Sequence, residues 1–176
     1  MSVREIRLLG DPVLREEAEP VEEIDEEIRR LADDLLETMY DADGVGLAAP
    51  QVGVSLRMFA YDVREPDQPF GVLINPVVTE EEGSEKGEEG CLSIPGLSAV
   101  VERADRIVIE GLNPEGEEVR LEADGLLARC LLHERDHLDG VLFLDRISPI
   151  KRKLLLNKWS KMEPEEKRAA AGAGGL

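Results

Sequence analysis

The chain has two histidines, His133 and His137, and they lie four residues apart at the end of an apolar stretch. Residues i and i+4 share one face of a helix, so both imidazoles can bind one ion. Glu134 directly follows the first histidine and is close enough to move protons on a water at that ion. The pattern therefore predicts a buried, metal-holding helix around which the rest of the chain has to pack.

Two histidines at helical spacing can also be surface residues or hydrogen-bonded core residues. The segment 125–132 before them is mostly apolar, which indicates that the helix is largely buried. Burial of His133 and Glu134 is costly unless a partner satisfies them. A bound cation would satisfy both histidines and the glutamate together, so we favour the metal.

Apolar residues recur at helical spacing over 24–40, and acidic residues crowd the start of that segment, where the helix dipole favours them. Asp124 can cap the metal-motif helix, Gly140 can end it, and a last helix is expected at 149–162. Short β-like runs, the last two joined by a turn, lie at 56–63, 71–78, 97–101, 106–112 and 117–123. The order predicts an α+β fold: short antiparallel β-sheets packed around a central metal-binding helix, with an N-terminal and a C-terminal helix.

The length of 176 residues suits one compact domain. We expect one catalytic domain over 1–168, with 149–162 as its basic C-terminal helix, and a disordered tail over 169–176. The net charge of −18 argues against a general nucleic-acid surface, so no DNA partner is expected. There is neither a signal core nor an apolar run near the roughly 20 residues that span a bilayer, so we expect a cytoplasmic protein without a membrane partner.

A catalytic metal site commonly has three protein ligands and one open position. Without a third histidine, a thiolate or a carboxylate has to serve. Cys130 lies on the same helix, but seven residues of helix rise about 10.5 Å between it and His137, whereas metal–ligand bonds are about 2.0–2.3 Å long. We interpret Cys130 as a buried wall residue. Cys91 is free to approach from another segment, and by itself it fits a metal ligand as well as a buried thiol.

Three segments together are far more specific: GVGLAAPQ at 44–51, EGCLS at 89–93 and HERDHL at 133–138. In this order and spacing they resemble the signature motifs of bacterial peptide deformylase. The resemblance extends through 9–15 and 122–128 and covers nearly the whole chain except the C-terminal tail. It implies a metal-dependent hydrolase that removes the formyl group from the N-terminal formyl-methionine of newly made polypeptides.

The resemblance implies metal ligands Cys91, His133 and His137, with a water in the fourth position. Glu134 is then the general base and later the general acid. Gln51 and the backbone N–H of Leu92 are expected to hydrogen-bond the formyl oxygen. The family commonly uses Fe²⁺, which is therefore the expected cofactor, although the same ligands suit Zn²⁺, Ni²⁺ or Co²⁺.

The positions that match the family's pocket for the methionine side chain are Val45, Gly46, Leu92, Leu127, Cys130 and His133. Arg129 stands where an aliphatic residue is common, and we expect it at the rim of the pocket. Ser98 stands where many members have an Arg or Tyr that reaches toward the peptide, so the resemblance does not carry this contact over to Ser98. Asp136 fits an orienting role or a solvated helix position equally.

Five basic residues and no acidic one lie in the segment 150–161 of an otherwise acidic chain. Such a local reversal of charge indicates an anionic partner. In some deformylases the C-terminal helix docks on the ribosome, so the ribosome is a candidate partner for this segment. Pairing of these residues with the protein's own acidic surface is the alternative.

Two other functions fit the histidine motif. A zinc endopeptidase shares it, but such enzymes commonly use histidine or a carboxylate as third ligand, not a cysteine in EGCLS. A metal-stabilised, ribosome-associated binding protein is the non-catalytic alternative. A purely structural site is closed and needs neither Glu134 nor Gln51.

Overall fold

The structure, a computed structural model, describes residues 2–170. Helix α1 (Glu26–Asp41) begins after Asp25, whose carboxylate accepts a hydrogen bond from the N–H of Ile28 at 3.0 Å. Leu35 and Met39, on its apolar face, are fully buried in a cluster with residues of the neighbouring sheet. The expected N-terminal amphipathic helix is thus confirmed.

Five strands form one antiparallel sheet in the order β1-β2-β3-β6-β7. They are β1 (Gly46–Ala48), β2 (Met58–Tyr61), β3 (Gly71–Glu82), β6 (Arg106–Leu112) and β7 (Glu118–Asp124). Two further strands, β4 (Glu85–Gly90) and β5 (Ser98–Arg103), form a separate antiparallel hairpin with Gly90 opposite Ser98. Strands β1 and β4 were not predicted from the sequence, whereas the bounds of β6 agree with the prediction.

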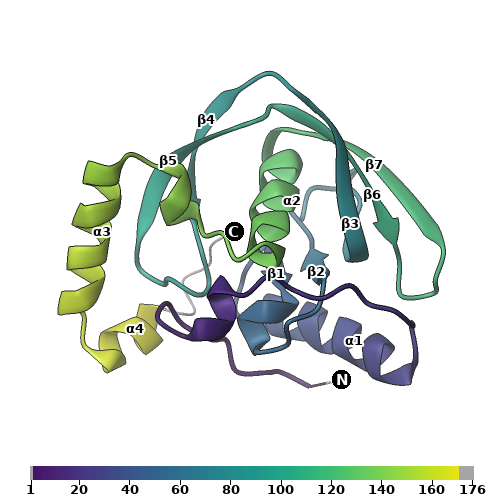
Figure 1. Cartoon of the computed structure of the whole chain (residues 1–176), viewed down its shortest axis with the longest axis horizontal. Coiled ribbons are helices and arrows are strands. Elements are labelled where there is room, and N and C mark those ends of the chain that lie inside the picture. The colour runs from purple at the N-terminus through teal and green to yellow at the C-terminus, as the bar shows by residue number, and fades with distance from the viewer. Residues whose placement is uncertain (1, 171–176) are drawn as a thin grey trace.

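Helix α2 (Gly125–Leu138) carries the histidine motif and lies in the middle of the molecule, between the β4–β5 hairpin and strands β3, β6 and β7 (Figure 1). Eleven of its residues are buried, as the apolar sequence predicted. Asp124 has the backbone conformation of an N-cap, but its side chain makes no capping hydrogen bond, so that detail of the prediction was wrong. Gly140 has a φ of 72°, which glycine adopts readily, and it follows the end of the helix as expected.

Helix α3 (Pro149–Lys161) starts after Ser148, whose hydroxyl accepts the N–H of Lys151 at 3.3 Å. A short helix, α4 (Pro164–Ala170), follows it and was not predicted. The Lys167 ammonium lies 4.3 Å from the ring centroid of the buried Trp159, which holds α4 against α3. Because α4 reaches Ala170, the predicted tail began two residues too early; its remainder, 171–176, lies outside the described residues.

Three 3₁₀ helices connect these elements: Pro12–Arg15, Ala49–Val52 and Phe143–Arg146. The one at Ala49–Val52 places Gln51 beside the loop that joins β4 to β5. In that loop, Leu92 and Ser93 begin a turn directly after Cys91, and Ser93 contacts Gln51. Within residues 2–170, no helix is both long and apolar enough to cross a bilayer. The observed architecture is the expected α+β fold with α2 at its centre.

Candidate metal centre

Cys91, His133 and His137 converge in the buried interior, with their donor atoms all within 4.8 Å of one another. The Nε2 atom of His137 lies 3.4 Å from Sγ of Cys91 and 3.2 Å from Nε2 of His133. In a tetrahedral site with usual bond lengths, two imidazole nitrogens are about 3.3 Å apart, and a thiolate sulfur is about 3.6 Å from each. The separations fit one shared ion of this coordination.

The three candidate ligands come from two different elements. Cys91 directly follows the last residue of β4, and both histidines lie on α2. Cys130 is outside this group, and its thiol donates instead to the carbonyl oxygen of Val45 at 3.3 Å. Burial raises the pKa of the Cys130 thiol well above its usual range, which keeps it protonated. The structure thus brings together the three candidate ligands named from the sequence and leaves Cys130 in a buried apolar cluster.

Glu134 is fully buried beside these ligands, and neither of its carboxylate oxygens has a hydrogen-bond partner among the described residues. Burial, together with the charges of Glu89 and Asp136, raises its pKa to about 7, although His133 and Arg103 act in the opposite direction. A buried carboxylate without partners is costly unless another polar group satisfies it. The orphaned oxygens therefore fit a site that takes up a metal with a water or a polar substrate.

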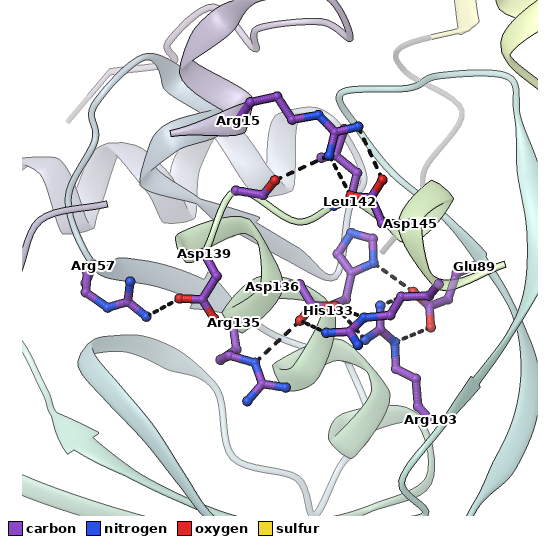
Figure 2. A network of polar contacts seen from close by, with 12 residues as sticks. Arg15, Arg57, Glu89, Arg103, His133, Arg135, Asp136, Asp139, Leu142 and Asp145 are labelled. Atoms are coloured by element: carbon purple, nitrogen blue, oxygen red, sulfur yellow. Dashed lines mark hydrogen bonds and ion pairs between the residues drawn. The ribbon is translucent and has the colours of Figure 1, made fainter. Parts of the chain in front are cut away.

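Glu89 orients the first histidine. Its Oε1 atom lies 2.8 Å from Nδ1 of His133 (Figure 2). That contact leaves Nε2 of His133 on the side of Cys91 and His137. Burial by itself would raise the pKa of Glu89, but hydrogen bonds from His133 and Arg103 bring it down to about 2. A carboxylate that accepts the outer N–H of a ligating histidine fixes its tautomer and ring orientation.

A buried ion network extends from Glu89 (Figure 2). Arg103 donates to Glu89 through Nε at 2.6 Å and Nη2 at 2.9 Å, and to Asp136 through Nη1 at 2.9 Å. Arg146 adds two hydrogen bonds to Asp136, at 2.8 and 3.0 Å. Asp136 is only 1% exposed, so it is not a solvated helix residue. The structure favours the alternative role, in which Asp136 orients its neighbours.

Gln51 presents an amide donor to the same site. Its Oε1 accepts the backbone N–H of Ala48 at 2.9 Å, and its Nε2 donates to Ser93 Oγ at 3.0 Å and lies 3.6 Å from Cys91 Sγ. This network assigns the amide orientation. The backbone N–H of Leu92, next to Cys91, has no acceptor among the described residues. Two donors thus lie beside the candidate ligands.

Known proteins resemble this chain over most of its length. A family model described as polypeptide deformylase matches residues 3–153. The peptide deformylase of Acidothermus cellulolyticus is 59% identical over 156 residues, 89% of this chain and 85% of that protein. That of Thermodesulfovibrio yellowstonii is 48% identical over 161 residues, 90% of this chain and 98% of that protein.

The chain belongs to the polypeptide deformylase family. It is a metal-dependent hydrolase that removes the formyl group from the N-terminal formyl-methionine of newly made polypeptides, with release of formate. The endopeptidase and the non-catalytic binding protein that the motif alone allowed are therefore not supported.

Solved deformylase structures agree with this assignment. The crystal structure of the Legionella pneumophila enzyme is 44% identical with a TM-score of 0.86, and the match covers 91% of this chain and 95% of that one. The Ehrlichia chaffeensis deformylase in complex with actinonin is 40% identical with a TM-score of 0.86, over 93% and 99% of the two chains. The expected fold and activity are thus confirmed.

The residues expected to bind the substrate of this deformylase do not all lie in one cluster. Val45, Leu127 and Cys130 share one apolar cluster, and Leu92 lies beside Gly44 and Cys91. Gly46 lies against Glu134. Leu92 thus directly follows a candidate ligand, and Gly46 lies against the carboxylate beside the ligands. Contact of all these residues with substrate stays a prediction.

Arg129 is placed differently from what the sequence suggested. Its guanidinium donates to Glu89 and to the backbone carbonyls of Val101 and Glu85, and only 8% of the residue is exposed. The expected place at the rim of the pocket does not fit these contacts, because its donors are directed into the hairpin. Ser98 is exposed, and its hydroxyl donates to Glu88 at 2.7 Å.

Sequence reasoning gave no role to Glu89, Arg103, Ser93 or Arg146. A signal existed for Glu89 only: it directly precedes the Gly90–Cys91 pair of the EGCLS motif, and a carboxylate that is buried there has to find a cation. The positions of Arg103 and Arg146 depend on how the hairpin pairs and where it meets α2. No local pattern reports that arrangement.

Proposed function

We propose that Cys91, His133 and His137 hold one Fe²⁺ ion, and that Glu134, Gln51 and the N–H of Leu92 act on the formyl group of N-formyl-methionyl nascent peptides. The observation that carries this proposal is the convergence of one sulfur and two nitrogens beside a buried carboxylate without partners. A closed structural site would need no such carboxylate.

A divalent metal at this position would lower the pKa of water and polarise the formyl carbonyl. One thiolate and two imidazoles suit Fe²⁺, Zn²⁺, Ni²⁺ and Co²⁺, because affinity alone does not select among them. The resemblance to iron-using deformylases supports Fe²⁺. Glu89 contributes by holding Nδ1 of His133, so that Nε2 of that ring is directed to the ion.

Glu134 moves the protons. It accepts one from the attacking water and delivers it to the nitrogen of the departing amine. Burial raises the pKa of Glu134 to about 7 in the metal-free protein, and a pKa in this range suits a group that must both accept and donate a proton near neutrality. Gly46 leaves room for its carboxylate.

Gln51 and Leu92 stabilise the formyl oxygen as it gains negative charge. The side-chain amide of Gln51 donates from Nε2 and its Oε1 is fixed by Ala48, so the donor is held in place before substrate arrives. Fixed donors aimed at developing charge are worth about 3 kcal/mol each. Val45, Gly46, Leu127 and Cys130 form the wall that receives the methionine side chain.

The test is a formate assay with formyl-Met-Ala-Ser. Protein kept anaerobic with Fe²⁺, or reconstituted with Ni²⁺, should release stoichiometric formate, whereas chelated protein and Glu134→Gln loaded with metal should not. Cleavage at an internal peptide bond without formate would instead indicate an endopeptidase. Metal analysis of protein purified anaerobically from cells identifies the native ion; Zn²⁺, Ni²⁺ or Co²⁺ in place of Fe²⁺ would contradict the proposal of Fe²⁺.

The basic segment 150–161 supports a second proposal, that this deformylase works in the cytoplasm on the ribosome. The segment lies on α3, where Lys151, Lys153, Lys158 and Lys161 are exposed, as is Ile150. Among the five basic residues of this segment in the described structure, only Arg152 makes an ion pair, with Asp145 at 3.5 Å. Four ammonium groups therefore stay available for an anionic partner.

Truncation of α3 would be a poor test, because it would remove Trp159, a residue of α3 whose side chain is buried in a core cluster. Reversing Lys151, Lys153 and Lys158 to Glu leaves that core intact. We expect sedimentation with ribosomes to weaken by more than 10-fold, in a salt-dependent way. A control that reverses the exposed residues Arg29, Arg30 and Arg120 should sediment like wild type; equal behaviour of both variants would contradict the proposal.

A further inference from the structure

The metal ligands of this chain are supplied by two elements that belong to different layers. Cys91 is attached to the β4–β5 hairpin, which forms a two-stranded sheet of its own, and both histidines lie on α2. Figure 1 shows the hairpin passing along one side of α2. The distance from the sulfur to the two nitrogens therefore depends on how the hairpin is held against the helix.

Arg129 connects the two elements directly. From α2, its Nη1 donates to Glu89 Oε2 at 2.7 Å and to the carbonyl of Val101 at 2.9 Å, and its Nη2 donates to the carbonyl of Glu85 at 2.9 Å. The acceptors lie on both strands of the hairpin. One side chain thus fixes β4 and β5 together relative to the helix.

The hairpin is shaped to receive this guanidinium. A Cβ atom on Gly87, in the middle of β4, would stand 2.9 Å from both Cζ and Nε of Arg129. Gly87 pairs with Val101 across the hairpin, and Val101 provides one of the carbonyl acceptors. Absence of a side chain at Gly87 is what lets the planar group lie against the strand.

Arg129 and His133 are one helical turn apart on the same face of α2 and meet the same carboxylate. Glu89 receives Arg129 on Oε2 and His133 on Oε1. Arg103 crosses in the opposite sense, from β5 to Asp136 of α2, and also binds Glu89. Arg129 thus reaches from the helix to the hairpin, and Arg103 reaches from the hairpin to the helix. Both bind Glu89, which lies two residues before Cys91.

We infer that Arg129 is a positioning residue of the metal centre, which sets the place of Cys91 relative to His133 and His137 by fixing Glu89 and both hairpin strands to α2. The inference rests on the proposed ligand set. A lysine could keep one charge–charge contact, but its single ammonium cannot reproduce the planar, three-acceptor arrangement. Methionine keeps the length of the side chain and none of its donors.

The test measures Co²⁺ binding, by competition with a chelator and by the thiolate-to-cobalt absorption band. Loss of a group that orients ligands typically weakens metal binding by about 10- to 100-fold. We expect Arg129→Met to raise the dissociation constant by at least about 10-fold and to shift the band, and Arg129→Lys to fall between Arg129→Met and wild type. Gly87→Ala should act in the same direction, because it displaces the guanidinium without removing it.

Two controls separate positioning from general stability. Arg4→Met removes an arginine that pairs with the buried Asp34 at 2.8 Å on α1, which supplies no ligand. It should lower the melting temperature of the metal-free protein and leave Co²⁺ affinity unchanged. In the double variant Arg129→Met/Gly87→Ala, the glycine change should add nothing further, since its target is gone.

Wild type tests the proposed ligand set, and the variants test the positioning role of Arg129. If wild type binds no Co²⁺ or shows no thiolate band, the proposed ligand set is wrong. If wild type binds with that band, and Arg129→Met and Gly87→Ala both bind within twofold of it, the positioning role is overturned. An equal loss of affinity in Arg4→Met would overturn it too, because the effect would then be one of stability.

Discussion

Gly46 lies directly against the carboxylate of Glu134: a Cβ atom at this position would stand 2.5 Å from Oε2 and 2.8 Å from Cδ. Real Cβ atoms are not found so close to other heavy atoms. The strand that borders the metal centre can therefore carry no side chain here unless Glu134 moves.

Gly46→Ala should lower kcat/KM for formate release by about 100-fold, the scale of loss that a displacement near 1 Å causes in a catalytic group. The metal ligands are untouched, so Co²⁺ affinity should change little. Steady-state kinetics with formyl-Met-Ala-Ser and a parallel metal titration check both statements. Wild-type kinetics in this variant would show that the position of Glu134 does not limit the reaction.

Glu134→Gln should reduce kcat by about 10²- to 10⁴-fold, the usual contribution of a positioned acid–base group. The amide matches the carboxylate in shape but cannot accept and return the proton. Metal content, measured by elemental analysis after gel filtration, should equal that of wild type. Loss of the metal together with activity would mean that Glu134 holds the ion and does not serve as the base.

The two cysteines should behave differently toward metal. Cys91→Ser should abolish the thiolate-to-cobalt absorption band, because the sulfur at 3.4 Å from His137 Nε2 is gone. Cys130→Ser should retain the band, since that thiol faces the carbonyl of Val45. A band that survives in Cys91→Ser and disappears in Cys130→Ser would reverse the ligand assignment.

Glu89 should contribute to stability in a pH-dependent way. Its pKa is lowered to about 2 in the fold, so its contribution is fully present above its unfolded pKa, near 4.3, and is lost as the pH falls toward 2. The shift corresponds to a contribution on the order of 3 kcal/mol. In metal-free protein, the difference in unfolding free energy between wild type and Glu89→Gln should therefore shrink below about pH 4.3. A difference that is constant with pH would contradict the ionised state of Glu89.

Elements with a strong periodic pattern could be predicted from the sequence. Helices α1 and α2 and strand β6 follow from apolar spacing, and the turn between β6 and β7 follows from its Asn-Pro-Glu-Gly residues. Strand β4 could not be predicted because its residues, EKGEEG, have neither β-propensity nor alternation; its pairing with β5 makes it a strand. Strand β1 is only three residues long and lies inside a glycine-rich segment.

The residues of the metal centre also differ in whether the sequence predicts their positions. His133, Glu134 and His137 are fixed relative to one another by the helix, so local sequence is enough to predict them. The link from Glu89 to Arg103 and Arg129 depends on where the hairpin meets α2, which no local pattern contains. The expected position of Arg129 was wrong for that reason. The resemblance suggested the rim of the methionine pocket, but the carbonyls that accept its hydrogen bonds belong to β4 and β5.

A metal shared between Cys91 and His133 would act as a cross-link through the chain. The segment between them is about forty residues long, and closing a loop of that size in the unfolded chain carries an entropic cost comparable to that of a disulfide. The three ligands come together only where the end of β4 meets α2. Uptake of metal should thus be a late event in folding, and the loaded protein should unfold more slowly than the metal-free one.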